Sequence, residues 1–293
     1  MAWIDRLSKL LPNQRLDVRT RFELLRDAVS GTMSKFYMAR DRKTGQIVGL
    51  KILDRQKTAF LESRFKGLNK PTEGAIAIQF DHPRIVRTYE HGLTTEGAQY
   101  LEMEYLDGVL LNAMLASRDG RLEGRRANLI RQAAEAVDAV HKAGFIHRDV
   151  CPRNMMIVGP SGGLKLIDFG LAVPATPPFM QPGNRTGTPN YMAPELVRRR
   201  ATDQRLDVFS FGVSAYEILT FELPWARGTT GMAAMTHDQP PADIRQYRPQ
   251  IHPTLAKAVH WCVEPDLSRR CPSMEQFLLA IRRVEHEDKN GSP

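Results

Sequence analysis

A polar loop between two short apolar runs places the tightest constraint on how this chain can fold. Phe145-Ile146 precedes the loop and residues 155–158 follow it, so a strand, a loop and a second strand are predicted. The loop contains Asp149 and, five residues later, Asn154. A second carboxylate, Asp168, follows Asn154 by fourteen residues. The pattern therefore attaches two carboxylates and one amide to a small framework of strands.

These three side chains have the chemistry that phosphoryl transfer needs. A carboxylate such as Asp149 can orient a hydroxyl group and accept its proton. Asn154 and Asp168 offer the oxygen ligands that Mg²⁺ prefers, and nucleotide phosphates supply further oxygens. The sequence therefore predicts phosphoryl transfer with ATP and Mg²⁺ as cofactors.

The composition is that of an ordinary globular protein. With 293 residues, 42% hydrophobic and 25% charged, the chain can bury the cores of one large or two modest domains. No apolar run is long enough to span a bilayer and no signal-peptide pattern is present, so no integral membrane segment is expected. Three scattered cysteines do not make a disulfide framework or a zinc site, and they favour a reducing, cytoplasmic location.

The net charge of +8 comes from 41 basic against 33 acidic residues. Such an excess can indicate a nucleic-acid partner. Here the excess is dispersed, and the densest cluster, residues 198–200, has no interleaved aromatic residues on which bases could stack. No nucleic-acid partner is therefore predicted.

The pattern of apolar residues changes along the chain from strands to helices. The predicted strands cover residues 22–29, 36–40, 47–53, 85–89 and 100–105. A helical segment, residues 56–80, is interrupted near Gly67 and Pro71. Further helices are predicted over residues 124–143, 206–221, 254–262 and 274–284.

This order of elements indicates a two-lobed α+β fold. We expect a small N-terminal lobe (residues 21–103) with an antiparallel sheet and one helix, a hinge (104–108), and a larger, mainly helical C-terminal lobe (109–286), with the chemistry at their junction. Residues 1–20 are expected to be an extension with a short amphipathic helix folded onto the domain. The polar residues 287–293 are expected to be a disordered tail.

Three motifs resemble the signature set of the protein kinase family, in its order and spacing. They are His147-Arg148-Asp149 with Asn154, Asp168-Phe169-Gly170, and Ala193-Pro194-Glu195. Val48-Gly49-Leu50-Lys51 is similar to the lysine-bearing third strand of that family. The resemblance covers residues 22 to about 284 and implies that residues 21–286 are a protein kinase domain with a protein substrate.

The resemblance implies a role for each polar residue of these motifs. Asp149 accepts the proton of the substrate hydroxyl, and Asn154 and Asp168 hold Mg²⁺. Lys51 reaches the α- and β-phosphates of ATP. Its anionic partner is expected to be Glu73, which falls nine residues before His82, with Glu62 as the alternative.

The resemblance also assigns the residues around the nucleotide. The hinge is Glu104-Tyr105-Leu106, whose backbone hydrogen-bonds adenine, Met103 is the gatekeeper, and Met156 packs beneath the base. The phosphate-covering loop, Val29 to Phe36, retains only Gly31 of the usual three glycines. Phe36 replaces a valine above adenine and Gly49 an alanine beside it, so larger and smaller side chains are expected to offset each other in volume.

Residues 187–195 resemble the peptide-docking segment of serine/threonine kinases. Thr188 is expected to hydrogen-bond near Asp149, and Glu195 to pair with Arg270. Asp207 resembles the helix aspartate that braces the catalytic loop. Arg148 suggests an activation loop, residues 171–185, that is organised by phosphorylation, with Thr176 and Thr186 as weak candidate sites.

One substitution raises the question of activity. Cys151 occupies the position of a lysine that neutralises the migrating phosphoryl group in serine/threonine kinases. Arg153, four residues after Asp149, stands where tyrosine kinases carry an arginine with a similar role, and we expect it to replace that lysine. The predicted function is therefore a serine/threonine protein kinase. The alternative is a pseudokinase that acts as a nucleotide-binding scaffold with little transfer activity; the oligomeric state is left open.

Overall fold

The computed structural model describes residues 15–26, 29–31, 33–159, 162–183, 185–226 and 233–288, and these form two compact units. The first unit runs to Asp81 and resumes over Val86–Leu106; the second comprises His82–Ile85 and the chain from Asp107 onward. Residues 82–85 fall in the second unit because Ile85 forms a parallel bridge with Leu166 and the N–H of Leu166 donates to the carbonyl of Arg84 at 2.8 Å. The lobe boundaries expected from the sequence, residues 21–103, did not predict that residues 82–85 belong to the second unit.

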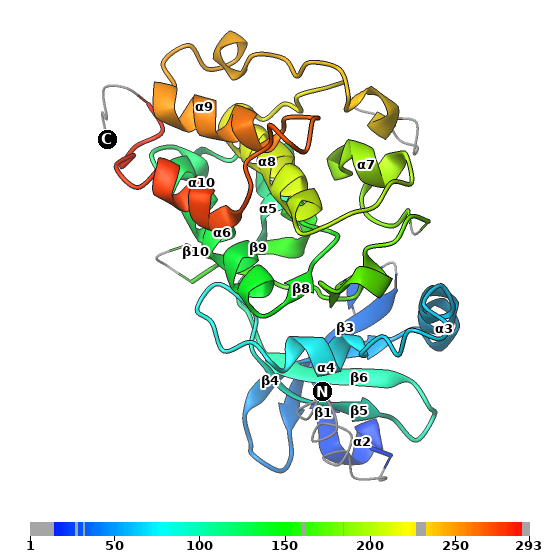
Figure 1. Cartoon of the computed structure of the whole chain (residues 1–293). Helices are drawn as coiled ribbons and strands as arrows, with labels where there is room; N and C mark the ends of the chain where they lie inside the picture. The colour runs from blue at the N-terminus through cyan, green and yellow to red at the C-terminus, as the bar shows by residue number, and fades with distance from the viewer. Residues whose placement is uncertain are drawn as a thin grey trace. The chain divides into compact units, whose positions relative to one another are not determined.

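An antiparallel sheet forms the body of the first unit (Figure 1). Its strand order is β1-β3-β4-β6-β5, with β2 paired to β3. The strands are β1 (Phe22–Leu24), β2 (Val29–Ser30), β3 (Ser34–Asp41), β4 (Ile47–Leu53), β5 (Thr88–Leu93) and β6 (Gln99–Glu104). The predicted α+β fold is confirmed. The strand predicted over residues 85–89 instead begins at Thr88, because Ile85 belongs to the second unit.

The two faces of the sheet follow from alternation along β4. Val48 and Leu50 join a buried cluster on one face, and Leu16 and Val18 of the N-terminal segment pack against that cluster. Lys51 points to the opposite face, because successive strand residues alternate. α2 (Val18–Arg21) leads into β1. The amphipathic helix predicted before it lies in residues 1–14, outside the described residues.

Two short helices accompany the sheet, α3 (Arg55–Ser63) and α4 (Glu73–Ala77). They are separate, as the predicted interruption requires, and Gly67 lies at a φ of +83° between them. The Thr72 hydroxyl caps α4 by accepting a hydrogen bond of 3.2 Å from the N–H of Ala75. α4 packs so closely on β5 that a Cβ added to Gly74 would lie only 2.4 Å from the Cβ of His91 (Figure 1).

Helices form most of the second unit. They are α5 (Leu111–Ala116), α6 (Arg126–Lys142), α7 (Pro194–Val197), α8 (Arg205–Thr220), α9 (Pro253–Cys262) and α10 (Met274–Ala280). α8 is buried from Leu206 to Thr220, with α6 and α9 packed around it (Figure 1). Phe221 ends α8 in a left-handed conformation with φ of +64°. The four predicted helices are present, although α10 ends earlier than expected.

Short strands carry the polar loop. β8 (Phe145–Ile146) pairs with β11 (Val173–Pro174), and β9 (Met155–Val158) pairs with β7 (Gly108–Leu110) and β10 (Gly163–Leu166). The predicted arrangement of strand, loop and strand is therefore confirmed.

The prediction of a disordered tail from residue 287 is wrong for its first two residues. Glu287 is buried, and its carbonyl accepts a hydrogen bond of 2.7 Å from the N–H of His252. Asp288 forms an ion pair of 2.6 Å with Arg248. These long-range contacts outweigh the polar character of the segment. Residues 289–293 lie outside the described residues.

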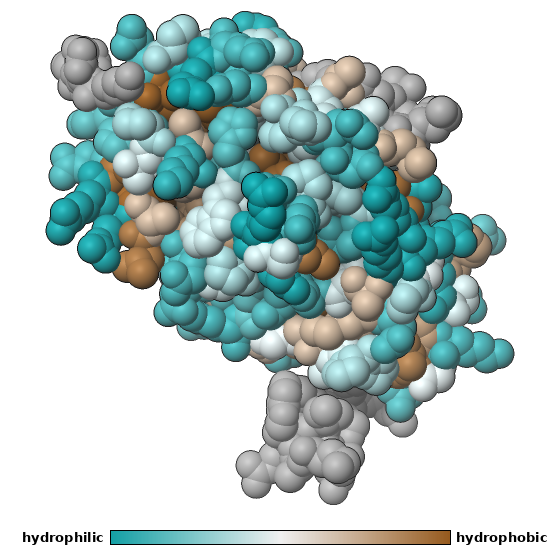
Figure 2. Space-filling model, turned by 45° about the horizontal axis from the view of Figure 1, so that its top comes forward, coloured by the Kyte–Doolittle hydropathy of each residue, from teal (hydrophilic) through white to brown (hydrophobic). Residues whose placement is uncertain are grey.

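Hydrophilic residues cover most of the face shown in Figure 2, where hydrophobic residues form only small, separate groups. In the part of the chain that the structure describes, no helix combines the length and the apolar character needed to cross a bilayer.

Candidate active site

Asp207 fixes the backbone of the polar loop in the second unit. Its carboxylate accepts hydrogen bonds from the N–H groups of His147 at 2.6 Å and Arg148 at 2.8 Å, and its Oδ2 lies 3.0 Å from His141 Nε2. Burial raises the pKa of the fully buried Asp207, but hydrogen bonds from His141 and the loop outweigh burial and lower the pKa below its usual value. The loop conformation thus depends on one carboxylate of α8.

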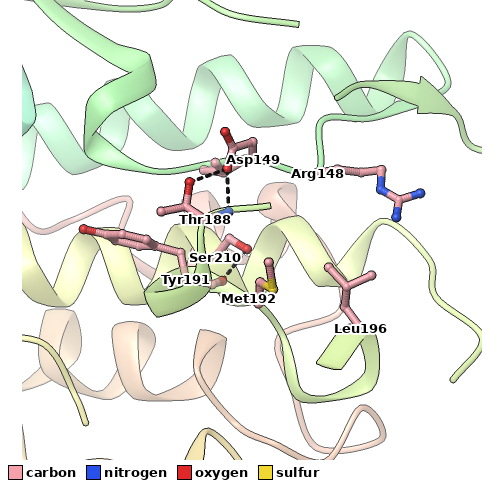
Figure 3. Close-up of a pocket in the computed structure, with 8 residues that line it drawn as sticks. Arg148, Asp149, Thr188, Tyr191, Met192, Leu196 and Ser210 are labelled. Atoms are coloured by element: carbon pink, nitrogen blue, oxygen red, sulfur yellow. Dashed lines mark hydrogen bonds between the residues drawn. The ribbon is translucent and has the colours of Figure 1, made fainter. Parts of the chain in front are cut away.

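Hydrogen bonds to both carboxylate oxygens hold the side chain of Asp149. Its Oδ1 accepts hydrogen bonds from the Thr188 hydroxyl at 2.6 Å and the Thr188 N–H at 2.9 Å, as Figure 3 shows. Its Oδ2 accepts from Asn154 Nδ2 at 2.9 Å and Arg153 Nη2 at 3.1 Å. The expected contact of Thr188 is therefore present, and a carboxylate bonded at both oxygens is fixed in orientation.

Asn154 and Asp168 are linked through the backbone. The N–H of Ile167 donates to the Asn154 carbonyl at 3.0 Å, and Asp168 Oδ1 accepts from the Gly170 N–H at 2.8 Å. Asn154 Nδ2 also donates to the Asp149 carbonyl at 2.8 Å, which assigns the amide nitrogen and leaves Oδ1 as the possible metal ligand.

This donor set fits Mg²⁺. Among the described residues there is no group of three or more His, Cys, Asp or Glu side chains that could enclose a metal ion. Mg²⁺ is commonly held through one or two protein oxygens together with water and substrate phosphates. One amide oxygen and one carboxylate, as in Asn154 and Asp168, suit that mode of binding.

Lys51 and Glu73 form a buried ion pair in the first unit. Lys51 Nζ lies 2.5 Å from Glu73 Oε1, and both side chains are less than a tenth exposed. The alternative partner, Glu62, instead accepts a hydrogen bond of 2.8 Å from Gln99 Nε2. The pairing therefore agrees with the first choice made from the sequence.

The side chains of Phe36 and Met103 fill the space beside Gly49. A Cβ added to Gly49 would lie 2.7 Å from Phe36 Cζ and 3.2 Å from Met103 Cγ. The phenylalanine ring thus takes the space of the alanine side chain that Gly49 replaces. The expected offset in volume is present.

The other residues expected to contact the nucleotide lie in or next to the strands β2, β6 and β9. Val29 pairs with Phe36 across β2 and β3, and the Gly31 N–H donates to the Ser34 carbonyl at 2.8 Å. Glu104 ends β6 and Leu106 ends the first unit. In the second unit Met156 is half-buried on β9, paired with Lys165 of β10.

A small, shallow pocket adjoins Asp149 (Figure 3). It is lined by Arg148, Asp149, Val150, Thr188, Tyr191, Met192, Leu196 and Ser210. The Ser210 hydroxyl donates to the Tyr191 carbonyl at 2.7 Å. Glu195, three residues after Met192 in the sequence, accepts two hydrogen bonds from Arg270 at 2.7 and 2.9 Å, and both side chains are buried. The expected pairing of Glu195 with Arg270 is present.

Cys151 and Arg153 differ in burial and in charge. The Cys151 side chain is 1% exposed, with its Sγ 3.5 Å from Thr188 Oγ1. Burial, reinforced by the charge of Asp149, raises the pKa of this thiol to about 12. A neutral thiol therefore occupies the position of the family's lysine, and Arg153, half exposed, is the cation bonded to Asp149.

Sequence reasoning missed His141 and Ser210, which brace the loop and the docking segment. His141 lies in the last turn of α6 and Ser210 in the second turn of α8. His141 belongs to no motif, and Ser210, although it lies in the segment of residues 207–212 that carries Asp207, has no predicted role; each acts through a residue distant in sequence. Only their positions on buried helices next to the motifs could have suggested them.

A family model of the protein kinase domain matches residues 22–279. The chain belongs to the protein kinase family. This kinase chain is 34% identical over 281 residues to serine/threonine-protein kinase PknB of Mycolicibacterium smegmatis, covering 93% of this chain and 44% of the relative. It is 32% identical over 272 residues to PknA of Mycobacterium tuberculosis, covering 90% and 60%, and 28% identical over 268 residues to pkn3 of Myxococcus xanthus, covering 88% and 48%. The kinase chain thus spans about half the length of the curated relatives it matches.

Proposed function

We propose that this chain is an ATP-dependent serine/threonine protein kinase that transfers the γ-phosphate of ATP to hydroxyl groups of protein substrates. The observation that carries the proposal is the arrangement around Asp149, whose two carboxylate oxygens are bonded by Thr188, Asn154 and Arg153. A fixed carboxylate beside a cation and an amide suits a reaction that depends on positioning and charge stabilisation.

Asp149 acts on the substrate in this proposal. Its carboxylate orients the incoming serine or threonine hydroxyl and accepts the proton as the oxygen attacks phosphorus. The guanidinium of Arg153 lies beside Asp149 and stabilises the negative charge of the migrating phosphoryl group, the task that a lysine in place of Cys151 performs elsewhere in the family. Thr188 holds the carboxylate in position.

The roles of individual residues in nucleotide binding follow the family resemblance. Lys51, held by Glu73, contacts the α- and β-phosphates, while Asn154 and Asp168 hold Mg²⁺. When bound there, Mg²⁺ would supply positive charge that neutralises the phosphates. The residues that surround the adenosine moiety or form the phosphate-covering loop are Val29, Gly31, Phe36, Gly49, Met103, Glu104, Leu106 and Met156.

A protein substrate and a cytoplasmic location complete the proposal. The segment around Thr188 supports a peptide substrate with a serine or threonine acceptor, in line with the names of the relatives. Cys151, Cys262 and Cys271 are free thiols buried in the structure, which supports a reducing compartment.

The test is transfer of labelled phosphate from ATP to dephosphorylated casein, comparing the wild type with Asp149→Asn. We expect transfer by the wild type and a loss of at least a hundredfold in the variant, with ATP affinity kept. If both proteins bind ATP tightly and neither transfers phosphate, the chain is instead a nucleotide-binding scaffold.

A further inference from the structure

The carbonyl group of Met192 is held by a buried histidine far along the chain. His237 Nδ1 lies 2.7 Å from the Met192 oxygen, and the His237 side chain is 2% exposed. A carbonyl oxygen can only accept, so Nδ1 carries the proton and donates. His237 therefore fixes the backbone at a residue that lines the pocket next to Asp149.

The imidazole of His237 is itself held in a stack of rings. Its ring centroid lies 4.7 Å from that of Trp225, and Trp225 stacks on Phe209 at 5.7 Å with an interplanar angle of 17°. Trp225 Nε1 also donates to the Gln239 carbonyl at 3.0 Å, which ties down the turn that carries His237. The histidine thus has little freedom to move away from Met192.

The stack of Phe209, Trp225 and His237 also supports the docking segment through Arg270. The guanidinium of Arg270 lies 4.9 Å from the centre of the Phe209 ring and makes the two hydrogen bonds to Glu195. Met192 and Glu195 are therefore anchored from one stack, by a backbone contact from His237 and a side-chain contact from Arg270. Loss of His237 would release only the end nearer the pocket.

We propose that His237 is a positioning residue for the protein substrate, acting through Met192. Its hydrogen bond holds the apolar wall that Met192 and Leu196 contribute to the pocket beside Asp149. No contact described above links His237 to Asn154, Asp168 or Met156, the residues of the second unit that are assigned to the nucleotide and Mg²⁺. This inference rests on the proposed function, because it concerns recognition of the substrate protein.

The kinetic test compares His237→Leu, His237→Asn and the control His260→Leu with the wild type, using ATP and dephosphorylated casein. We expect His237→Leu to raise the KM for casein about tenfold and leave the KM for ATP unchanged, because one buried hydrogen bond is lost. His237→Asn should restore the wild-type KM, since the amide nitrogen of asparagine can take the place of Nδ1. His260 accepts a hydrogen bond of 3.2 Å from the Ile244 N–H, and its replacement should not change the KM for casein.

Hydrogen exchange gives a readout that does not need activity. His237→Leu should speed amide exchange in peptides covering residues 188–197 relative to the wild type, while His237→Asn and His260→Leu should not. If the wild type transfers no phosphate to casein, the proposed function fails and the exchange comparison still decides on the anchor. Unchanged exchange in His237→Leu, or a KM for casein equal to that of the wild type in an active enzyme, overturns the inference.

Discussion

Asp207 Oδ1 accepts a hydrogen bond of 2.8 Å from the backbone N–H of Arg148, a residue whose φ is +69°. Non-glycine residues rarely adopt this left-handed conformation, and they keep it only where the surroundings enforce it. The catalytic loop is therefore held in a strained conformation by a carboxylate of α8.

Asp207→Asn should destabilise the protein by about 3 kcal/mol and lower kcat at least tenfold. An asparagine presents an NH₂ group in place of one oxygen, and in either orientation of the amide this donor would face a loop N–H, that of Arg148 or that of His147. Urea unfolding and phosphate transfer to casein measure the two effects. Asp138→Asn, which removes an ion pair with Lys142 on α6, is the control and should change neither.

Arg153→Ala should lower kcat about tenfold to a hundredfold and leave ATP affinity nearly intact. In the proposed mechanism Arg153, which bonds to Asp149, stabilises the charge of the phosphoryl group, while Cys151 is neutral. Steady-state kinetics and nucleotide titration separate the two parameters. Arg121→Ala, which alters an exposed pair with Asp119, should behave as the wild type. An unchanged kcat in Arg153→Ala would refute the role of Arg153.

Glu73→Gln should raise the KM for ATP about tenfold, because the buried ammonium of Lys51 loses its anionic partner. Glu62→Gln is the matched control, since Glu62 bonds to Gln99 rather than to Lys51. Gly74→Ala should have an effect similar to that of Glu73→Gln, because the new methyl group would displace α4 from His91. Equal KM values for Glu73→Gln and Glu62→Gln would contradict this account.

Cys151 should resist alkylation in the folded protein. Burial raises the pKa of the Cys151 thiol to about 12, so very little thiolate, the reactive form, is present at pH 8. Peptide mass spectrometry after treatment with iodoacetamide should find Cys151 unmodified in buffer and modified in guanidinium chloride. Rapid labelling of Cys151 in the native protein would show that its thiol is more acidic or more accessible than the structure indicates.

The Arg21–Asp41 ion pair should make stability depend on pH in the acid range. Hydrogen bonds from Arg21, and further ones from Lys43 and Thr44, hold the pKa of the buried Asp41 well below its usual 3.8. A depressed carboxyl pKa contributes stability that is present above the unfolded value and lost as pH falls through the folded one. The difference in unfolding free energy between the wild type and Asp41→Asn should therefore be full at pH 6 and smaller at pH 3. A difference that stays constant would contradict the assignment.

The sequence predicted best what is encoded locally. The loop from His147 to Asn154 lies between short strands because apolar runs flank it, and its motif needs no distant contact to be recognised. The choice between Glu73 and Glu62 was harder, because Pro71 makes the helix boundaries ambiguous. The structure resolves it through the cap of Thr72 and the close packing of Gly74 on His91.

What the sequence could not predict depends on partners far along the chain. Ile85 lies in an apolar run that reads as a strand of the sheet, but it bridges Leu166 and therefore belongs to the second unit. Glu287 looks like part of a polar tail, yet it is buried against His252. His237 belongs to no motif, and only the position of the Met192 carbonyl gives it significance. Local patterns carry no information about such pairings.

The polar side chains of the buried helix α8 recur at a spacing that lines them up. Asp207 holds the catalytic loop, Ser210 donates to the Tyr191 carbonyl, and Ser214 donates to the Val150 carbonyl at 3.4 Å. Steps of three and four residues place them on one stripe of the helix. A single residue inserted between Ser210 and Ser214 would turn the stripe by about 100° at that point. The number of residues between Asp207 and Ser214 on α8 therefore keeps the catalytic loop and the docking segment in register with each other.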